Sequence, residues 1–245
     1  MTNKWLKVAL MATAIATGTS INIDAETVLY VPQDDRPVSL QYTVDTAREA
    51  GMTILTPPQN LISGKNYQGQ ADQIMAWVEQ NAGRADVMVL STDTLIYGGL
   101  VDSRKHNIPL STLESRLKRI ESLKARNKKV RIYGFGTVMR SPRASGGGTE
   151  PAYYAEYGPT IFQIAALQDK LDSGSLTQEE TQKLMSLQAS VPVEYLQDWF
   201  DRRQKNMKIN KELIDETRSG VFDYFALGHD DTSQLSQSAL EGRYL

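Results

Sequence analysis

Charged and polar side chains recur in this sequence just beyond short hydrophobic runs that look like buried strands. They are Asp34, Asp35, Arg36, Asp93, Tyr97, Arg104, Arg140, His229, Asp230 and Asp231. Because the carboxyl ends of parallel strands lie on one edge of a sheet, we expect these side chains to converge. Two carboxylates that share a water-poor pocket acquire different pKa values, so one can stay protonated and act as an acid. Glycoside hydrolysis needs such a pair.

The residue types therefore favour a hydrolase that acts on carbohydrate, and more specifically a glycosidase that needs no cofactor. We predict that Asp230 and Asp231 form the catalytic pair and that Asp93 assists them. The predicted substrate-binding residues are Asp34, Asp35, Arg36, Tyr97, Arg104, Arg140 and His229. Arginine side chains beside the carboxylates would suit an anionic or acylated sugar.

Two other functions fit the same positions. Asp34, Asp93, His229 and Asp230 could bind a divalent metal, as in a deacetylase or a phosphoesterase, although one histidine among several arginines is a poor match for zinc. A binding protein without catalysis would instead use the carboxylates to accept hydrogen bonds from a sugar, or its arginines to hold an anion. Each cluster also has a purely structural interpretation, such as Asp35 capping a helix that starts near Pro37.

Composition narrows the class of protein. The chain has 245 residues, is 40% hydrophobic and 23% charged, and carries a formal net charge of -2, so no basic surface for nucleic acid is expected. Cysteine is absent, which removes disulfides, thiolate zinc ligands and thiol nucleophiles together. The expected partner is a small molecule or a glycan.

The first 25 residues resemble a secretory signal. Lys4 and Lys7 precede a short apolar run from Val8 to Ala16, and small residues follow up to Ala25. This run is shorter than the roughly 20 residues that span a bilayer, and no other stretch approaches that length. We therefore expect export to the periplasm, the cell surface or the medium, with no membrane span in the mature chain.

Five hydrophobic segments are expected to place the polar residues, and they read as buried parallel strands. The segments are Thr27–Val31, Met52–Thr56, Val87–Leu90, Val130–Gly134 and Tyr224–Leu227. Helical patterns separate them, as in the spacing of Leu113, Leu117, Ile120 and Leu123. This alternation predicts an α/β fold of parallel strand–helix repeats over residues 26–245. We favour a partial, barrel-like arrangement, with an open doubly wound sheet as the alternative.

Residues 158–220 have no strand signal and are predicted to form a helical insertion. Thr177 with Glu180 has the pattern of a capping box, as does Ser111 with Glu114 in the preceding helix. Pro192 marks the start of a long helix and Gly220 its end. Since the last strand ends near the C-terminus and five strands cannot close an eight-stranded barrel, we expect the chain to be the front part of a longer protein.

At the polar clusters the sequence resembles the bacterial DUF4127 family, a domain of unknown function. The residues that carry the resemblance are the runs 30–37, 56–58 and 91–101, then Ser103-Arg104, and finally the run 228–231. The resemblance extends over nearly all of the chain after the signal. It implies no assigned activity, but it does imply a longer protein and a helix bearing Arg202, Arg203, Asn206 and Asn210. That helix face could form a lid over the strand ends or a solvated surface.

Overall fold

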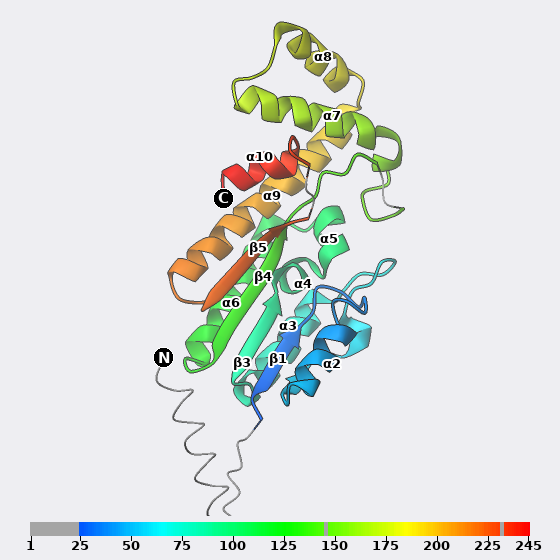
Figure 1. The fold of residues 1–245 in the computed structure, drawn as a ribbon. Coiled ribbons are helices and arrows are strands. Elements are labelled where there is room, and N and C mark those ends of the chain that lie inside the picture. Colours follow the sequence, from blue (N-terminus) through cyan, green and yellow to red (C-terminus); the bar gives the residue numbers. More distant parts are fainter. Residues whose placement is uncertain (1–24, 145–146, 231–232) are drawn as a thin grey trace, which may run out of the picture.

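The centre of the molecule is an open, all-parallel sheet of five strands (Figure 1). The computed structural model describes residues 25–144, 147–230 and 233–245. The strands are β1 (Thr27–Val31), β2 (Thr53–Leu55), β3 (Val87–Ser91), β4 (Arg131–Val138) and β5 (Tyr224–His229). All five predicted strands and the α/β class are confirmed, and β4 runs four residues further than expected.

The sheet is not closed into a barrel. Its strand order is β2-β1-β3-β4-β5, so β2 and β5 are opposite edges with three strands between them. Closure would require those two edges to pair, and β2 pairs only with β1 whereas β5 pairs only with β4. The barrel-like arrangement that we favoured is therefore wrong, and the open-sheet alternative is the one observed.

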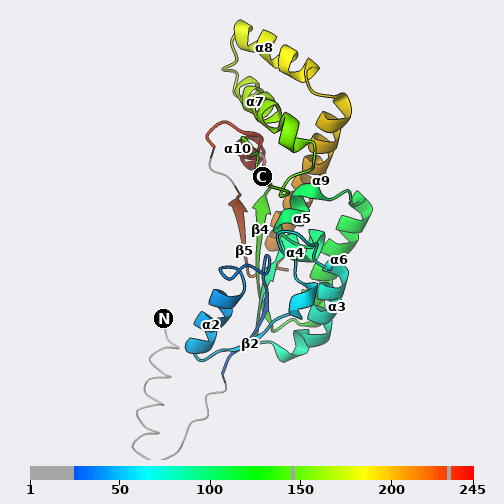
Figure 2. The same ribbon diagram turned by 90° about the vertical axis from the view of Figure 1, so that its right-hand side faces the viewer.

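Helices cover the sheet unequally. Figure 2 shows α2 (Gln41–Glu49) on one face, whereas α3 (Ala71–Asn81), α6 (Leu110–Arg126) and α9 (Val193–Arg218) lie on the other. The remaining helices are α4 (Thr92–Tyr97), α5 (Leu100–Lys105), α7 (Tyr154–Asp172), α8 (Gln178–Ala189) and α10 (Gln237–Arg243), with short 3-10 turns at Gln59–Leu61 and Ala82–Arg84. In these described ranges no helix has the length and apolar character required to cross a membrane.

The principal core lies between the sheet and the three helices α3, α6 and α9 that cover one of its faces. Alternate strand residues point into it because side chains alternate across a strand. The strand residues that are fully buried there are Leu29, Val31, Met88, Leu90 and Ile132. The α6 positions that the sequence spacing selected meet them, and all four are at most 3% exposed: Leu113, Leu117, Ile120 and Leu123. The opposite face is more open, and Tyr224 of β5 is 62% exposed there.

The helical insertion is confirmed as α7, α8 and α9, and α7 and α8 extend beyond the carboxyl edge of the sheet (Figure 1). Thr177 and Glu180 form the predicted capping box at the start of α8. Pro192 directly precedes α9, and Gly220, with φ of 85°, lies just beyond its end. The second predicted capping box is wrong, because α6 begins at Leu110 after Pro109 and Ser111 already lies inside the helix.

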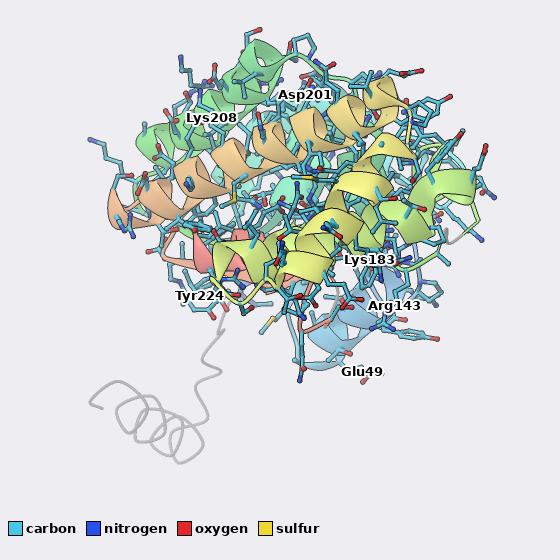
Figure 3. The ribbon with its side chains drawn as sticks, turned by 90° about the horizontal axis from the view of Figure 1, so that it is seen from above. Glu49, Arg143, Lys183, Asp201, Lys208 and Tyr224 are labelled. Atoms are coloured by element: carbon cyan, nitrogen blue, oxygen red, sulfur yellow. The ribbon has the colours of Figure 1, made fainter. Side chains whose placement is uncertain are left out.

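One face of α9 carries buried polar residues against the sheet edge and α5. Arg202, Arg203, Asn206 and Asn210 are all at most 5% exposed. Arg203 donates to both carboxylate oxygens of Glu241 and to the main-chain oxygens of residues 139 and 140. Neither of our expectations for this face, a lid or a solvated surface, is correct. Figure 3, which looks down from above, shows Asp201 and Lys208 of the same helix on the side of the molecule away from Glu49 and Tyr224.

We predict that Arg203→Met lowers the free energy of unfolding by about 3–5 kcal/mol, because Glu241 is then buried without its charge partner. Urea denaturation followed by circular dichroism measures the loss. The matched control is Arg218→Ala, whose ion pair with Asp215 is exposed on both sides and should contribute less than about 1 kcal/mol. Equal losses in the two variants would contradict a structural role for the buried arginine.

Candidate functional site

The chain changes direction at the carboxyl edge of the sheet between β1 and β3, which are neighbours in the strand order. The chain leaves β1 through α2 on one face and leaves β3 through α4 toward the other face (Figure 2). Loops that diverge from adjacent strands leave space between them, and ligands of open parallel sheets bind at such switch points. The residues directly beyond these two strands therefore define the candidate site.

Asp93 lies at this edge of the sheet, in the first turn of α4, and is only 2% exposed. Its Oδ2 accepts one hydrogen bond from Gln33 Nε2, beyond β1, and one from Thr137 Oγ1 of β4, each at 2.9 Å. Burial raises the pKa of Asp93 to about 6, the two hydrogen bonds oppose this rise, and the negative charge of Asp230 adds to it. A carboxyl group of this kind keeps its proton up to about pH 6 and can donate it to a substrate in that range.

Asp230 is the second carboxylate of the site and is held by an arginine. Arg104 donates from Nε and Nη2 to one oxygen of Asp230, at 3.0 and 2.6 Å. The Arg104 side chain is 5% exposed and that of Asp230 is 18% exposed. Burial lowers the pKa of Arg104, and the charge of Asp230 opposes that change. This contact favours the ionised form of Asp230, in contrast to the buried Asp93.

A second ion pair, between Arg140 and Glu150, lies next to the pair of Arg104 and Asp230. Glu150, 4% exposed, accepts from Arg140 and lies 4.0 Å from Nη1 of Arg104. Arg140 also donates to Thr149 Oγ1 at 2.8 Å. The four charges therefore alternate in sign from Arg140 through Glu150 and Arg104 to Asp230, and this alternation allows the buried Arg104 and the partly exposed Arg140 to lie close together.

Arg36 pairs with Asp34 after β1, and the charge of Asp230 after β5 also affects it. Its Nε and Nη2 approach Asp34 Oδ2 at 2.7 Å. The pKa of Arg36 is raised, first by the bond to Asp34 and further by the charges of Asp230 and Asp35, whereas burial lowers it. The charge of Asp230 affects Arg36 although β3 and β4 lie between β1 and β5 in the sheet. The acidic turns therefore share one electrostatic environment.

Local geometry fixes the segment after β3. Ser91 caps α4 by accepting from the main-chain N–H of Thr94 at 3.3 Å. Gly98 ends α4 with φ of 111°, and a Cβ there would lie 2.7 Å from the main-chain oxygen of Gly69. Only glycine combines this dihedral angle with this close approach. This turn places Arg104 near the end of the next helix, α5, where it reaches Asp230.

Comparison with known proteins identifies the family of this chain. A model of a protein family described as "Protein of unknown function (DUF4127)" matches residues 28–245. The chain belongs to this family. No curated protein and no solved structure matches it. The DUF4127 match therefore carries no activity of its own, and the chemistry must be argued from the site.

The DUF4127 fold does not bring every predicted residue into this site. Tyr97 is 7% exposed and stacks on His106 with 4.9 Å between ring centroids, so it is part of the interior. His229 is exposed and its Nδ1 lies 3.4 Å from Ser238 Oγ of α10. Asp35 accepts from the Tyr67 hydroxyl and does not cap α2, which begins at Gln41. Asp231 lies outside the described residues.

In the part of the chain that the structure describes, the ligands predicted for a metal ion do not converge. Its four predicted ligands have separate partners, and within the described residues no three histidine or carboxylate groups come together. Asp34 is bound to Arg36, Asp230 to Arg104, and Asp93 to two neutral donors. An arginine that already occupies a carboxylate disfavours a cation at the same oxygen.

Three residues of the site were not among the binding or catalytic residues predicted from the sequence. Gln33 and Thr137 hold Asp93, and Glu150 supports Arg104. Gln33 could have been found, because it stands two positions beyond β1 beside Asp34. Glu150 carries no such signal, since it follows a long irregular segment after β4 and its place depends on tertiary packing alone.

We predict that Asp93→Asn is more stable than the unchanged protein at neutral pH. Below about pH 4 Asp93 is protonated in both the folded and the unfolded state, so it adds no pH dependence. As the pH rises from 3.8 to about 6, the unfolded chain loses the proton first, and the folded state loses stability. The difference between these two pKa values corresponds to about 3 kcal/mol, which asparagine does not incur.

Urea denaturation at a series of pH values between 4 and 8 tests this prediction. The stability advantage of Asp93→Asn should grow up to about pH 6 and then level off. An advantage that does not change with pH would show that Asp93 ionises like an exposed carboxyl group.

Proposed function

We propose that this protein is a hydrolase that cleaves a glycosidic bond, with Asp93 as the proton donor and Asp230 as the ionised carboxylate. The observation that carries the proposal is the contrast between these two groups. Burial raises the pKa of Asp93 to about 6, whereas Asp230 is paired with Arg104. Two nearby carboxyl groups whose environments separate their proton affinities are the acid and the base that this reaction needs.

In the proposed mechanism Asp93 protonates the leaving oxygen as the glycosidic bond breaks. Gln33 and Thr137 both donate to Oδ2, and they orient the carboxyl group. Asp230 stabilises the positive charge that develops at the anomeric carbon, and Arg104 holds Asp230 in place and favours its ionised form. A water molecule then adds to the anomeric carbon, and the proton that this water loses restores the acid form of Asp93. The sequence assigned the catalytic pair to Asp230 and Asp231. The proposal pairs Asp230 with Asp93 because their interaction rests on described residues.

In this proposal the arginines have a structural role, because each of them is paired with a carboxylate. Arg36, Arg104 and Arg140 each already pair with a carboxylate, namely Asp34, Asp230 and Glu150 respectively. Arginines that are neutralised in this way supply little attraction for an anion. The proposal therefore favours an uncharged sugar over the anionic substrate that the sequence suggested.

We predict that Asp93→Asn lowers kcat/KM on natural glycosides by about 10²–10⁴-fold, the usual contribution of a general acid. The unchanged protein is first screened against a library of aryl glycosides and oligosaccharides to find a substrate. The matched control is Asp86→Asn, an exposed aspartate at the opposite, amino edge of the sheet, which should keep full activity.

Leaving-group chemistry separates the acid from a merely structural residue. A dinitrophenyl glycoside needs no protonation of its leaving oxygen, so Asp93→Asn should recover most of its rate on that substrate, whereas Asp230→Asn should not. Equal losses on both kinds of substrate would remove Asp93 as the acid. Sugar binding without turnover in the unchanged protein would favour the binding alternative and overturn the enzymatic proposal.

We also predict that kcat/KM falls about tenfold per pH unit above about pH 6, because Asp93 must be protonated to donate. The sign follows from an acid that is active only below its pKa. A pH series with a neutral aryl glycoside measures this profile. A rate that stays level between pH 6 and 8 would contradict the assignment.

We further propose that the protein is exported and loses its first 25 residues. Lys4, Lys7 and the apolar run that follows them have the pattern of a secretory signal, and β1 begins at Thr27, immediately beyond it. Expression with and without residues 1–25, followed by cell fractionation and mass determination of the N-terminus, tests this. Retention of the intact N-terminus in the cytosolic fraction would contradict it.

A further inference from the structure

A polar groove of about 750 Å³ opens beside the proposed catalytic edge. It lies at the carboxyl end of β2, between α2 and the turn after β1 on one side and the residues after β2 and α3 on the other. Its polar and aromatic lining includes Asp35, Gln41, Asp45, Arg48, Gln59 and Trp77. This volume falls within the range of about 300–1,000 Å³ that is usual for small-molecule sites.

The groove exists because β2 is short and lies at the edge of the sheet. It has three residues, and α2 and α3 leave the sheet on opposite faces, so neither helix fills the space beyond it (Figure 2). Pro57 is buried and Pro58 exposed, and their fixed backbone keeps the segment after β2 extended. The floor of the groove is therefore rigid.

The lining combines an apolar surface with neutral hydrogen-bonding groups. Trp77 packs against the core and still contributes to the groove, which gives the ring a fixed face. Gln41 and Gln59 are exposed amides, each able to donate and to accept, and neither bonds to another group in the described part of the chain. A ring with an apolar face and hydroxyl groups on its rim is complementary to such a surface.

The charges of the groove do not select an anion. Asp35 and Asp45 outnumber Arg48, so the lining carries one net negative charge. Arg48 lies 3.8 Å from Asp45, and both side chains are at least half exposed, so this ion pair is weak and can exchange for a bound ligand. A neutral polyhydroxylated ligand fits this lining better than a phosphate or a uronic acid.

The turn after β1 connects the groove to the catalytic edge. Gln33, two positions beyond β1, donates to Asp93 at 2.9 Å. Asp35, two positions further along the same turn, lines the groove. A ligand in the groove is therefore two residues along the chain from the side chain that holds Asp93.

We propose that this groove binds further sugar units of a neutral oligosaccharide whose cleaved bond lies at Asp93 and Asp230. The inference rests on the proposed function and deepens it, since it makes the natural substrate an oligomer. A chain of sugars that fills the groove contributes binding energy that a monosaccharide glycoside cannot, so catalysis should improve with substrate length.

The first experiment measures binding alone. Calorimetry with the full-length Asp93→Asn protein uses linear neutral oligosaccharides of glucose and of N-acetylglucosamine, from one to six units, as probes. We expect the affinity to rise at least tenfold between one and four units in one of the two series. Gln41→Ala and Gln59→Ala should each weaken binding of the longer probes about three- to tenfold, whereas Gln80→Ala, an exposed glutamine of α3 outside the groove, should not.

Tryptophan fluorescence gives an independent readout of the same site. Trp199 is 1% exposed, so a saturable change in emission that Trp77→Phe removes would place the ligand in the groove. If no probe binds, or if the glutamine variants of the groove match Gln80→Ala, the groove proposal is overturned.

Kinetics separate the two proposals. If short and long substrates are cleaved equally well and the groove variants change nothing, the groove proposal falls and the proposed function stands. If the long probes bind through Gln41, Gln59 and Trp77 but no glycoside in the library is cleaved by the unchanged protein, the groove is supported and the catalytic proposal fails.

Discussion

The burial of one carboxyl group organises the carboxyl edge of this sheet. Asp93 is 2% exposed, and the fold stabilises it through hydrogen bonds from two neutral donors, Gln33 and Thr137. These donors come from the ends of β1 and β4, the two strands on either side of β3. The register of three adjacent strands is thus tied to one side chain. Neutral donors satisfy the carboxyl group without fixing its charge, which leaves its pKa free to rise with burial.

The second carboxylate, Asp230, is paired with a cationic side chain, and the fold explains this difference from Asp93. Asp230 stands at the end of β5 and is more exposed, and its partner Arg104 reaches it from α5. The place of Arg104 depends on α9, because Asn206 Oδ1 accepts from His106 Nε2 and Asn206 Nδ2 donates to the main-chain oxygen of Ser103. Burial lowers the pKa of His106 to about 4, so this contact is made by a neutral ring at physiological pH. The helical insertion thereby supports the site from behind.

The sequence predicted the elements well and the assembly less well. Strand positions followed from short aliphatic runs, and the core face of α6 followed from Leu113 and its periodic neighbours, because burial and periodicity are local properties. Strand order is not local, so open sheet and barrel could not be distinguished. The same limit applies to the polar face of α9, where Arg203 has the composition of a surface residue but is paired with Glu241, 38 positions away. Site positions at strand ends were predictable, whereas their partners, such as Glu150, were not.

Charge balance at the edge links the site to its ligand. A sequence that places Arg36, Arg104 and Arg140 near strand ends suggests attraction for an anion, and that expectation was reasonable while their partners were unknown. In the fold each arginine faces a carboxylate, and Asp93, which accepts from two neutral donors, has its charge suppressed by burial. A ligand that carried its own negative charge would have to displace an internal partner from an arginine and leave that carboxylate unpaired, which is costly in a buried site. An uncharged ligand with hydroxyl groups requires no such exchange.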